Sequence, residues 1–373
     1  MTDSPATGGS INTKTASILI GKFILTAVLL CGLVHGQGGV VNSTQKLQQI
    51  ALFHWYQAGS VARFPVGNRP TALAFDGENI WVVNSFSNSL TVLRANDGGL
   101  VATIPTGLSP SGVAFDGANI WVTDFGSNNV LKVQANNGTV LGTFLTGSGP
   151  QAVAFDGANV WVTNSFTDNV TKLRASDGAN LGVFRVGSDP IGVAFDGTAI
   201  WVANHGSNNV TKLRASNGAT LGTFSVGNAP VEVAFDGANI WVSNFNSGNV
   251  TKLRASDGAQ RGTFAVGTQP VSLAFDGSSI WVTNEGSNNV TRLRASNGAT
   301  LGTFSVGIGP YGLAYDGANI WVANDGSSTV TELRASNGAN LGTFAVGSFP
   351  FGVAFDGANI WVANGVGNTV SKL

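Results

Sequence analysis

Residues 190–226 read PIGVAFDGTAIWVANHGSNNVTKLRASNGATLGTFSV, and this stretch decides the fold. Apolar and β-branched runs at 191–195, 199–203, 209–215 and 221–226 are separated by turn residues, among them Asp-Gly and Asn-Gly pairs. Such pairs favour tight hairpin turns, because both central residues of a type I′ turn need a positive φ. No run has the apolar spacing of a helix. The stretch therefore predicts four short antiparallel strands.

The same pattern recurs every 40 residues without insertion or deletion. Each copy has an Asp-Gly pair, and a Trp follows the Asp by five positions. The eight aspartates are Asp76, Asp116, Asp156, Asp196, Asp236, Asp276, Asp316 and Asp356. Four short strands per 40-residue unit are typical of a propeller blade. We therefore expect an all-β fold, an eight-bladed β-propeller with four antiparallel strands per blade over residues 61–373.

The two ends of the array predict how the ring closes. The last copy ends after its third strand, at Leu373, and lacks a fourth. The fourth-strand segment 222–227 of an internal copy aligns within residues 61–67. We therefore expect the last blade to be closed by an N-terminal strand, which would leave no open sheet edge.

Residues 1–36 have the pattern of a signal peptide. Lys14 and Lys22 precede an apolar stretch at 23–34, and Gly36 is small enough for a cleavage site. The alternative is an uncleaved anchor, the only membrane contact that the sequence predicts. We expect residues 37–60 to be a linker with a short helix at 45–56. These features predict a secreted, periplasmic or cell-surface protein.

The repeat resembles known propeller families. WVTN at 161–164 and WVAN at 201–204 resemble the YVTN-type repeat, and the P-x-G-x-A-F-D-G-x-x-I-W-V core is similar to NHL and streptogramin-lyase-like repeats. The resemblance implies a propeller outside the cytoplasm. The streptogramin lyases have histidines and a glutamate in their active site, whereas residues 61–373 contain a single histidine, His205. No catalytic residue is carried over.

Composition excludes several classes of function. Only 10% of residues are charged and the formal net charge is −1, so we expect no nucleic-acid partner. The one cysteine, Cys31, lies in the apolar N-terminal stretch, so we expect no disulfide in the ring. The Asp-Gly pairs offer one carboxylate per turn, where a calcium loop needs several. We expect no metal, no cofactor and a monomer.

Two segments differ between copies. One surrounds the proline that opens each blade, as at Ser188-Asp189, and the other follows the second strand, as at His205-Gly206. In an antiparallel meander both connections emerge on one face, here called the varied face. The Asp-Gly turns and the turns after the third strand lie on the opposite, uniform face. Loops on a rigid scaffold commonly carry function. We expect a ligand-binding face formed by Arg69, Phe86, Phe125, Phe166, Asp189, His205, Glu232, Phe245, Glu285, Tyr311, Asp325 and Phe351.

Three functions are compatible with these features of the sequence. The varied face favours an exported platform for an unknown protein or glycan ligand. The first alternative is a lyase or lactonase-type enzyme with a site at the channel mouth. The second is a structural cell-envelope repeat protein.

Apart from the varied segments, we expect the eight Trp side chains to pack between blades, and Lys172 and Lys212 to lie on a solvated outer strand face.

Overall fold

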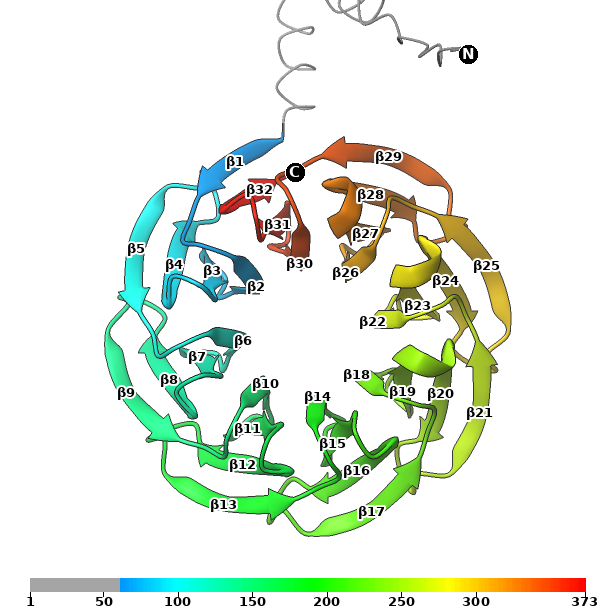
Figure 1. Ribbon diagram of the computed structural model, residues 1–373, viewed down its shortest axis with the longest axis horizontal. Coiled ribbons are helices and arrows are strands. Elements are labelled where there is room, and N and C mark those ends of the chain that lie inside the picture. Colours follow the sequence, from blue (N-terminus) through cyan, green and yellow to red (C-terminus); the bar gives the residue numbers. More distant parts are fainter. Residues whose placement is uncertain (1–60) are drawn as a thin grey trace, which may run out of the picture. The chain divides into compact units, whose positions relative to one another are not determined.

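The chain forms a ring of eight four-stranded antiparallel sheets in a computed structural model that describes residues 61–373 (Figure 1). Each sheet is one blade, and its first strand lies at the central channel. The eight-bladed, all-β propeller expected from the repeat is confirmed. The signal segment 1–36 and the linker helix expected at 45–56 lie outside the described residues.

The first four blades follow one another without interruption. Blade 1 has β2 (Pro70–Phe75), β3 (Asn79–Asn84), β4 (Ser89–Arg94) and β5 (Leu100–Pro105). Blade 2 has β6 (Pro110–Phe115), β7 (Asn119–Asp124), β8 (Asn129–Gln134) and β9 (Val140–Leu145). Blade 3 has β10 (Pro150–Phe155), β11 (Asn159–Asn164), β12 (Asn169–Arg174) and β13 (Asn180–Arg185). Blade 4 has β14 (Pro190–Phe195), β15 (Ala199–Asn204), β16 (Asn209–Arg214) and β17 (Thr220–Ser225).

Blades 5 to 7 add a short 3-10 turn after the second strand. Blade 5 has β18 (Pro230–Phe235), β19 (Asn239–Asn244), η1 (Phe245–Ser247), β20 (Asn249–Arg254) and β21 (Gln260–Ala265). Blade 6 has β22 (Pro270–Phe275), β23 (Ser279–Asn284), η2 (Glu285–Ser287), β24 (Asn289–Arg294) and β25 (Thr300–Ser305). Blade 7 has β26 (Pro310–Tyr315), β27 (Asn319–Asn324), η3 (Asp325–Ser327), β28 (Thr329–Arg334) and β29 (Asn340–Ala345). Blade 8 has β30 (Pro350–Phe355), β31 (Ile360–Asn364), β32 (Thr369–Lys372) and β1 (Ala62–Pro65).

The aspartate of each Asp-Gly turn accepts hydrogen bonds from its own turn and from the tryptophan of the same blade. Asp196 Oδ1 accepts the backbone N–H groups of Thr198 and Ala199 at 2.8 and 2.7 Å, while Gly197 takes a φ of 94°. Asp196 Oδ2 accepts the indole N–H of Trp201 at 2.7 Å. This Asp–Trp bond recurs in all eight copies. The five-residue spacing in the sequence thus reflects a turn that also satisfies a buried indole donor.

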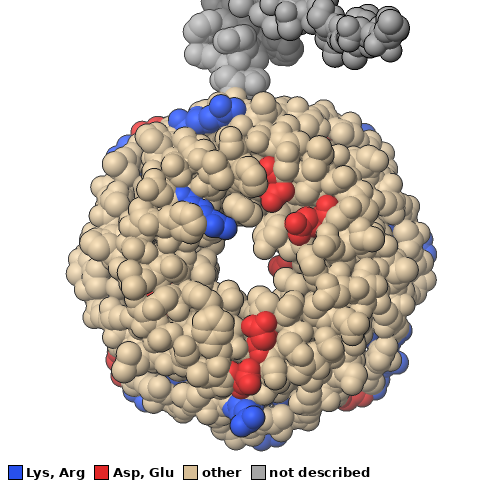
Figure 2. Space-filling view, viewed as in Figure 1, with Lys and Arg blue, Asp and Glu red and all other residues tan. Residues whose placement is uncertain are grey.

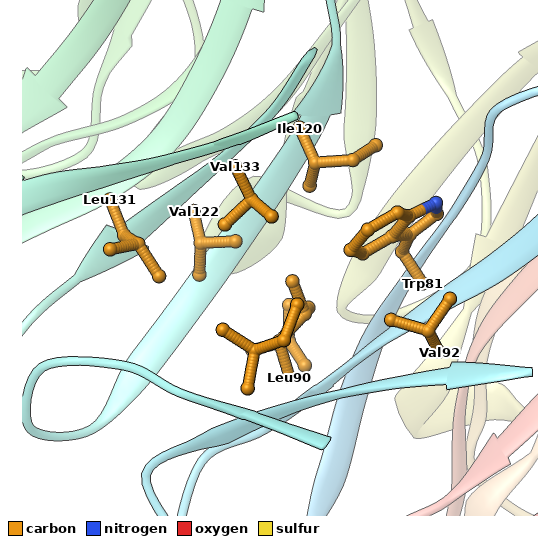
Figure 3. Close-up of a cluster of buried hydrophobic side chains, with 9 residues drawn as sticks. Trp81, Leu90, Val92, Ile120, Val122, Leu131 and Val133 are labelled. Carbon is orange, nitrogen blue, oxygen red and sulfur yellow. The ribbon is translucent and has the colours of Figure 1, made fainter. Parts of the chain in front are cut away.

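The hydrophobic core lies between blades. Trp201 is fully buried and packs with Val233, Ile240 and Val242 of the next blade, and its ring lies 5.6 Å from that of Phe224. Figure 3 shows the same arrangement between blades 1 and 2. Burial of this kind makes each blade depend on its neighbours. The expectation that the Trp side chains pack between blades is confirmed.

Ring closure uses the N-terminal strand, as expected. β1 pairs antiparallel with β32, with Ala62 opposite Lys372 and Phe64 opposite Val370. The Phe64 ring lies 5.7 Å from that of Trp361, as in the internal blades. Strands far apart in the sequence therefore complete one sheet.

Candidate functional site

Hydrogen bonds join the two variable segments of each blade. In blade 4 the N–H of His205 donates to the Asp189 carbonyl, and the N–H of Gly206 donates to the Ser188 carbonyl, both at 2.9 Å. Blade 1 repeats the first bond between Ser85 and Arg69. The two segments thus form one layer on the varied face, which is turned toward the viewer with η1, η2 and η3 in Figure 1.

The residue before each blade-opening proline has a left-handed backbone. Its φ lies between 50° and 69° in all eight copies. Glycine adopts this conformation without strain, but only Gly149 and Gly309 are glycines. The six other copies have Arg69, Ser109, Asp189, Ala229, Gln269 and Phe349. Side chains kept at a strained position are candidates for function.

A pocket of 580 Å³ opens on the varied face where blades 7, 8 and 1 meet. Phe86, Phe349 and Phe351 supply apolar walls, and Arg69 and Asp325 supply charge. The remaining lining residues are Asn68, Gly365, Val366 and Asn368. Nearly all of these residues come from the variable segments. Apolar walls with a few polar groups are typical of a ligand site.

Aromatic contacts shape this pocket. The Arg69 guanidinium lies 4.6 Å from the centre of the Phe86 ring, a cation–π contact. The Phe351 ring meets that of Tyr311 edge-on at 5.5 Å. Phe86 is 67% exposed and Phe349 is 46% exposed. Exposed aromatic rings of this kind are suited to bury a partner's apolar group.

The two charged lining residues are not paired with each other. Within residues 61–373, the Arg69 guanidinium has no carboxylate within ion-pair distance. Burial raises the pKa of Asp325 above its usual value. Figure 2 shows basic and acidic side chains separated around the mouth of the channel on this face. Both charges are therefore available to a ligand's polar groups.

Glu232, Glu285 and Tyr311 form a second group near the channel. Other blades have Gly, Ala or Ser where blade 5 has Glu232. Glu232 Oε2 accepts the Leu273 N–H of the next blade at 2.9 Å, and burial raises the pKa of Glu232 to about 7. Burial, and then the charges of Glu285, Glu232 and Asp325, raise the pKa of Tyr311. This side of the channel is therefore acidic.

The other expected site residues fall into separate places. Phe125 and Phe166 form an edge-on pair at 5.1 Å across blades 2 and 3. His205 Nδ1 lies 3.2 Å from an Asp189 oxygen in blade 4. Phe245 begins η1 in blade 5. The twelve expected residues therefore share one face but do not converge on one site.

Sequence reasoning missed part of the pocket. Phe349, Val366 and Asn68 line it, and their positions before the proline or after the second strand were the available signal. The solvated outer face expected for Lys172 and Lys212 is wrong. These side chains are only 4% and 5% exposed. In a single blade these side chains would be exposed, but the neighbouring blade covers them and accepts their hydrogen bonds.

The described residues show neither a metal cluster nor a membrane span. No group of three or more His, Cys, Asp or Glu side chains in residues 61–373 is arranged to hold a metal ion. No helix in that same range is long and apolar enough to cross a bilayer.

Comparisons with known proteins show similarity of fold only. Neither the protein-family models nor the curated proteins match this sequence. Among solved structures, the computationally designed Ika8 protein is similar, with a TM-score of 0.74, 14% identity and coverage of 83% of this chain and 99% of that one. BamB from Moraxella catarrhalis has a TM-score of 0.65 and 14% identity, and the match covers 84% of this chain and 98% of that one. A streptogramin B lyase has a TM-score of 0.56 and 16% identity, and the match covers 70% of this chain and 92% of that one.

Proposed function

We propose that this chain is an exported, monomeric binding protein whose varied face holds a peptide or other amphipathic ligand. The pocket between blades 7, 8 and 1 carries the proposal. There the ligand's apolar group lies among Phe86, Phe349 and Phe351, and its polar groups engage Arg69 and Asp325. A ring of rigid blades presents these side chains with little reorganisation on binding.

The position of the pocket supports this function. Residues from the loops of three blades meet there, and the backbone bonds between the two variable segments hold them in place. Phe349 keeps a φ of 55° at a position where Gly309 shows that glycine fits. A bulky ring at that cost is consistent with a side chain retained for binding.

A variant built from the protein's own repeats tests the pocket. Arg69→Ser, Phe349→Asp and Phe351→Ile each install the residue found at the same position of another blade. The turns should therefore keep their shape. Fluorescence of 1-anilinonaphthalene-8-sulfonate, an aromatic anion, reports binding. We expect the triple variant of the full chain to bind the dye at least tenfold more weakly than the natural protein.

The matched control changes the other aromatic pair. Phe125→Ser and Phe166→Gly also use residues found in sibling blades, but neither lines the pocket. This control should keep the dye affinity. Both proteins then serve as baits for the culture medium and envelope extract, and a partner should be captured by the control but not by the triple variant. Equal dye binding by the triple variant and the natural protein would refute a ligand site at this pocket.

A further inference from the structure

A cation inserted from one blade into the next holds most of the ring together on the uniform face. Lys212 Nζ donates to the carbonyls of Ala255 and Ser256 in the next blade, at 2.6 and 3.0 Å, and lies 5.0 Å from the Trp201 ring centre. The same contacts are made by Lys132, Lys172, Lys252 and Lys372. Five seams between blades thus contain the same ammonium site.

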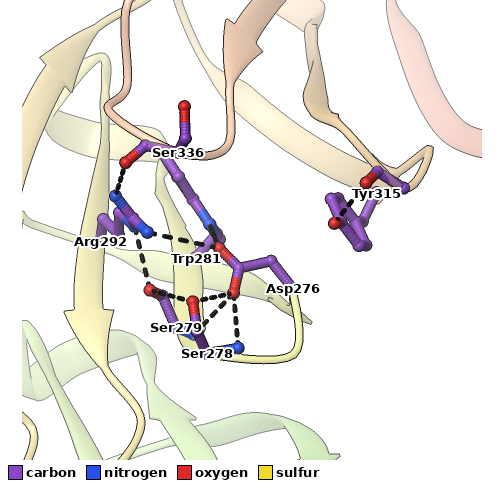
Figure 4. A network of polar contacts seen from close by, with 8 residues as sticks. Asp276, Ser278, Ser279, Trp281, Arg292, Tyr315 and Ser336 are labelled. Carbon is purple, nitrogen blue, oxygen red and sulfur yellow. Dashed lines mark hydrogen bonds and ion pairs between the residues drawn. The ribbon is translucent and has the colours of Figure 1, made fainter.

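Arginine occupies the equivalent site in a sixth seam. The Arg292 guanidinium donates to the Ser336 carbonyl at 2.8 Å and lies 3.8 Å from an Asp276 oxygen (Figure 4). A pocket of 440 Å³ between blades 6 and 7 includes Arg292 in its lining. The site is therefore defined by a turn carbonyl and a Trp face, with the Asp-Gly carboxylate within ion-pair distance in the arginine seam, and it accepts either kind of cation.

The seam between blades 1 and 2 lacks this cation. Val92 replaces the lysine and is buried in the apolar cluster with Leu131 and Val133 (Figure 3). The two carbonyls that a lysine here would reach are those of Ala135 and Asn136. No hydrogen bond within residues 61–373 ends on either oxygen. The seam between blades 7 and 8, which has Glu332, differs because blade 8 takes its outer strand from β1 and has no such turn.

A pocket opens beside these two carbonyls, as one does beside Arg292 in the seam between blades 6 and 7. Its volume is 370 Å³, and its lining includes Asp76, Ala135 and Asn136, the counterparts of Asp276, Ala335 and Ser336. Ala135 is also more exposed than its counterparts, which are all at least nine-tenths buried. The residues that carry the acceptors of the ammonium site are thus present, and they line a pocket that is open to solvent.

Two further substitutions make this seam acidic and roomy. Glu78 lines the pocket where other blades have Ala, Thr or Ser, and no Lys or Arg lines it. Ile104 replaces the phenylalanine that packs on the Trp ring in the other seams. Two carboxylates without a basic neighbour create a negative potential at the pocket mouth. The charge and the acceptors favour the same kind of ligand.

We propose that the seam between blades 1 and 2 is a binding site for an alkylammonium group, such as a lysine side chain of a partner. The ammonium donates to the Ala135 and Asn136 carbonyls beside Asp76, as the ring's own lysines do at the other seams. Glu78 adds a second negative charge at the entrance. This site lies on the uniform face and does not depend on the function proposed for the varied face.

The probe for this site is n-butylammonium, which is a lysine side chain without its backbone. We expect it to shift the indole N–H NMR signal of Trp81 in the full-length protein, with saturation in the millimolar range. Val92→Lys should supply the ring's own ammonium and weaken probe binding at least tenfold. Val92→Leu keeps an apolar residue and should leave probe binding unchanged. Glu78→Ala, which installs the residue of five sibling blades, should weaken it severalfold.

The contrary results are equally definite. n-Butanol has the same length without the charge, and an equal shift by n-butanol would overturn the proposal. So would a shift that persists unchanged in Val92→Lys, provided that the circular dichroism of this variant matches that of the natural protein. A Val92→Lys variant that does not fold leaves the Glu78→Ala comparison, where unchanged affinity would also count against the site.

Discussion

At the scale of single residues, a substitution of Phe349 should change ligand binding and folding stability in opposite directions. Its φ of 55° is costly for a residue with a Cβ, by about 1 kcal/mol. Phe349→Gly removes that strain and also removes a wall of the pocket. We therefore expect the free energy of unfolding of Phe349→Gly, measured with urea, to be higher than that of the natural protein by up to about 1 kcal/mol. Its affinity for the dye should fall. Ser109→Gly relieves the same strain outside the pocket and should change stability alone. A stabilised Phe349→Gly protein with full dye affinity would contradict a binding role for this ring.

Asp124 is the second residue with a testable individual effect. Seven blades have Asn at this position, where Asn164 Nδ2 donates to Asn169 Oδ1 at 2.8 Å and Thr171 Oγ1 at 2.9 Å. Blade 2 has the buried Asp124 instead, and neither of its carboxylate oxygens has a hydrogen-bond partner within residues 61–373. Burial raises the pKa of Asp124 to about 7.

This shifted pKa predicts how stability depends on pH. The folded protein holds a proton on Asp124 that the unfolded chain releases near its usual pKa of 3.8. Stability therefore falls as the pH rises from about 4 to about 7, by up to about 4 kcal/mol, and levels off above. Asp124→Asn should remove this loss, so its advantage over the natural protein in urea unfolding should be small at pH 4 and large at pH 8. Asn164→Asp should create a second loss of the same sign. An advantage that does not change with pH would show that Asp124 is not protonated in the folded state.

At the scale of elements, the third strand of six blades also bonds to a neighbouring blade through a Lys or Arg side chain. Lys212→Met keeps an unbranched side chain across Trp201 but leaves the Ala255 and Ser256 carbonyls without their ammonium donor. Hydrogen bonds to charged groups contribute about 1.5 to 3 kcal/mol, so we expect a loss of about 2 kcal/mol in chemical unfolding. Lys212→Arg should recover most of it, because Arg292 fills the same site in blade 6. If the free energy of unfolding of Lys212→Met lies within about 0.5 kcal/mol of the natural value, the cost of burying the Lys212 ammonium cancels the free energy of its hydrogen bonds.

The elements themselves were predictable, and their lateral contacts were not. Turn chemistry and strand residues recur in every copy, so strands such as 199–203 could be placed from the sequence to within a residue or so. The burial of Lys212 could not, because a single blade leaves that side chain exposed and only the next blade covers it. The one sequence signal was the loss of the lysine at Val92 and Glu332, which marks the two seams that differ.

The candidate site was predictable only as a face. Meander geometry places every variable segment on one side, and this held for Arg69, Phe86 and Phe351. It does not say which side chains meet, because that depends on rotamers and on the angle between neighbouring blades. Phe349 was missed for this reason, and Phe245 shares the face without joining the pocket.

At the scale of the whole molecule, closure of the ring depends on blade 8, where β1 and β32 are joined by strand pairing and not by a chain connection. Phe64 in β1 packs on Trp361, and its ring distance of 5.7 Å nearly equals the 5.6 Å between Phe224 and Trp201. Truncating either phenylalanine to Ala loses a similar area of buried apolar surface, which costs about 3 kcal/mol locally. The consequences differ, however, because blades follow on both sides of β17, whereas β1 links blade 8 to blade 1.

Phe64→Ala should therefore open the ring, whereas Phe224→Ala should only weaken it. Loss of the β1 pairing exposes the edge of β32, and an exposed strand edge pairs readily with another chain. We expect hydrogen exchange at Val370 and Ser371 to accelerate strongly in Phe64→Ala, with concentration-dependent dimers in sedimentation. In Phe224→Ala, the equivalent amides of Val210 and Thr211 should accelerate much less, and the protein should remain monomeric. Equal exchange in the two variants would mean that the seams between blades, rather than the β1–β32 pairing, hold the ring closed.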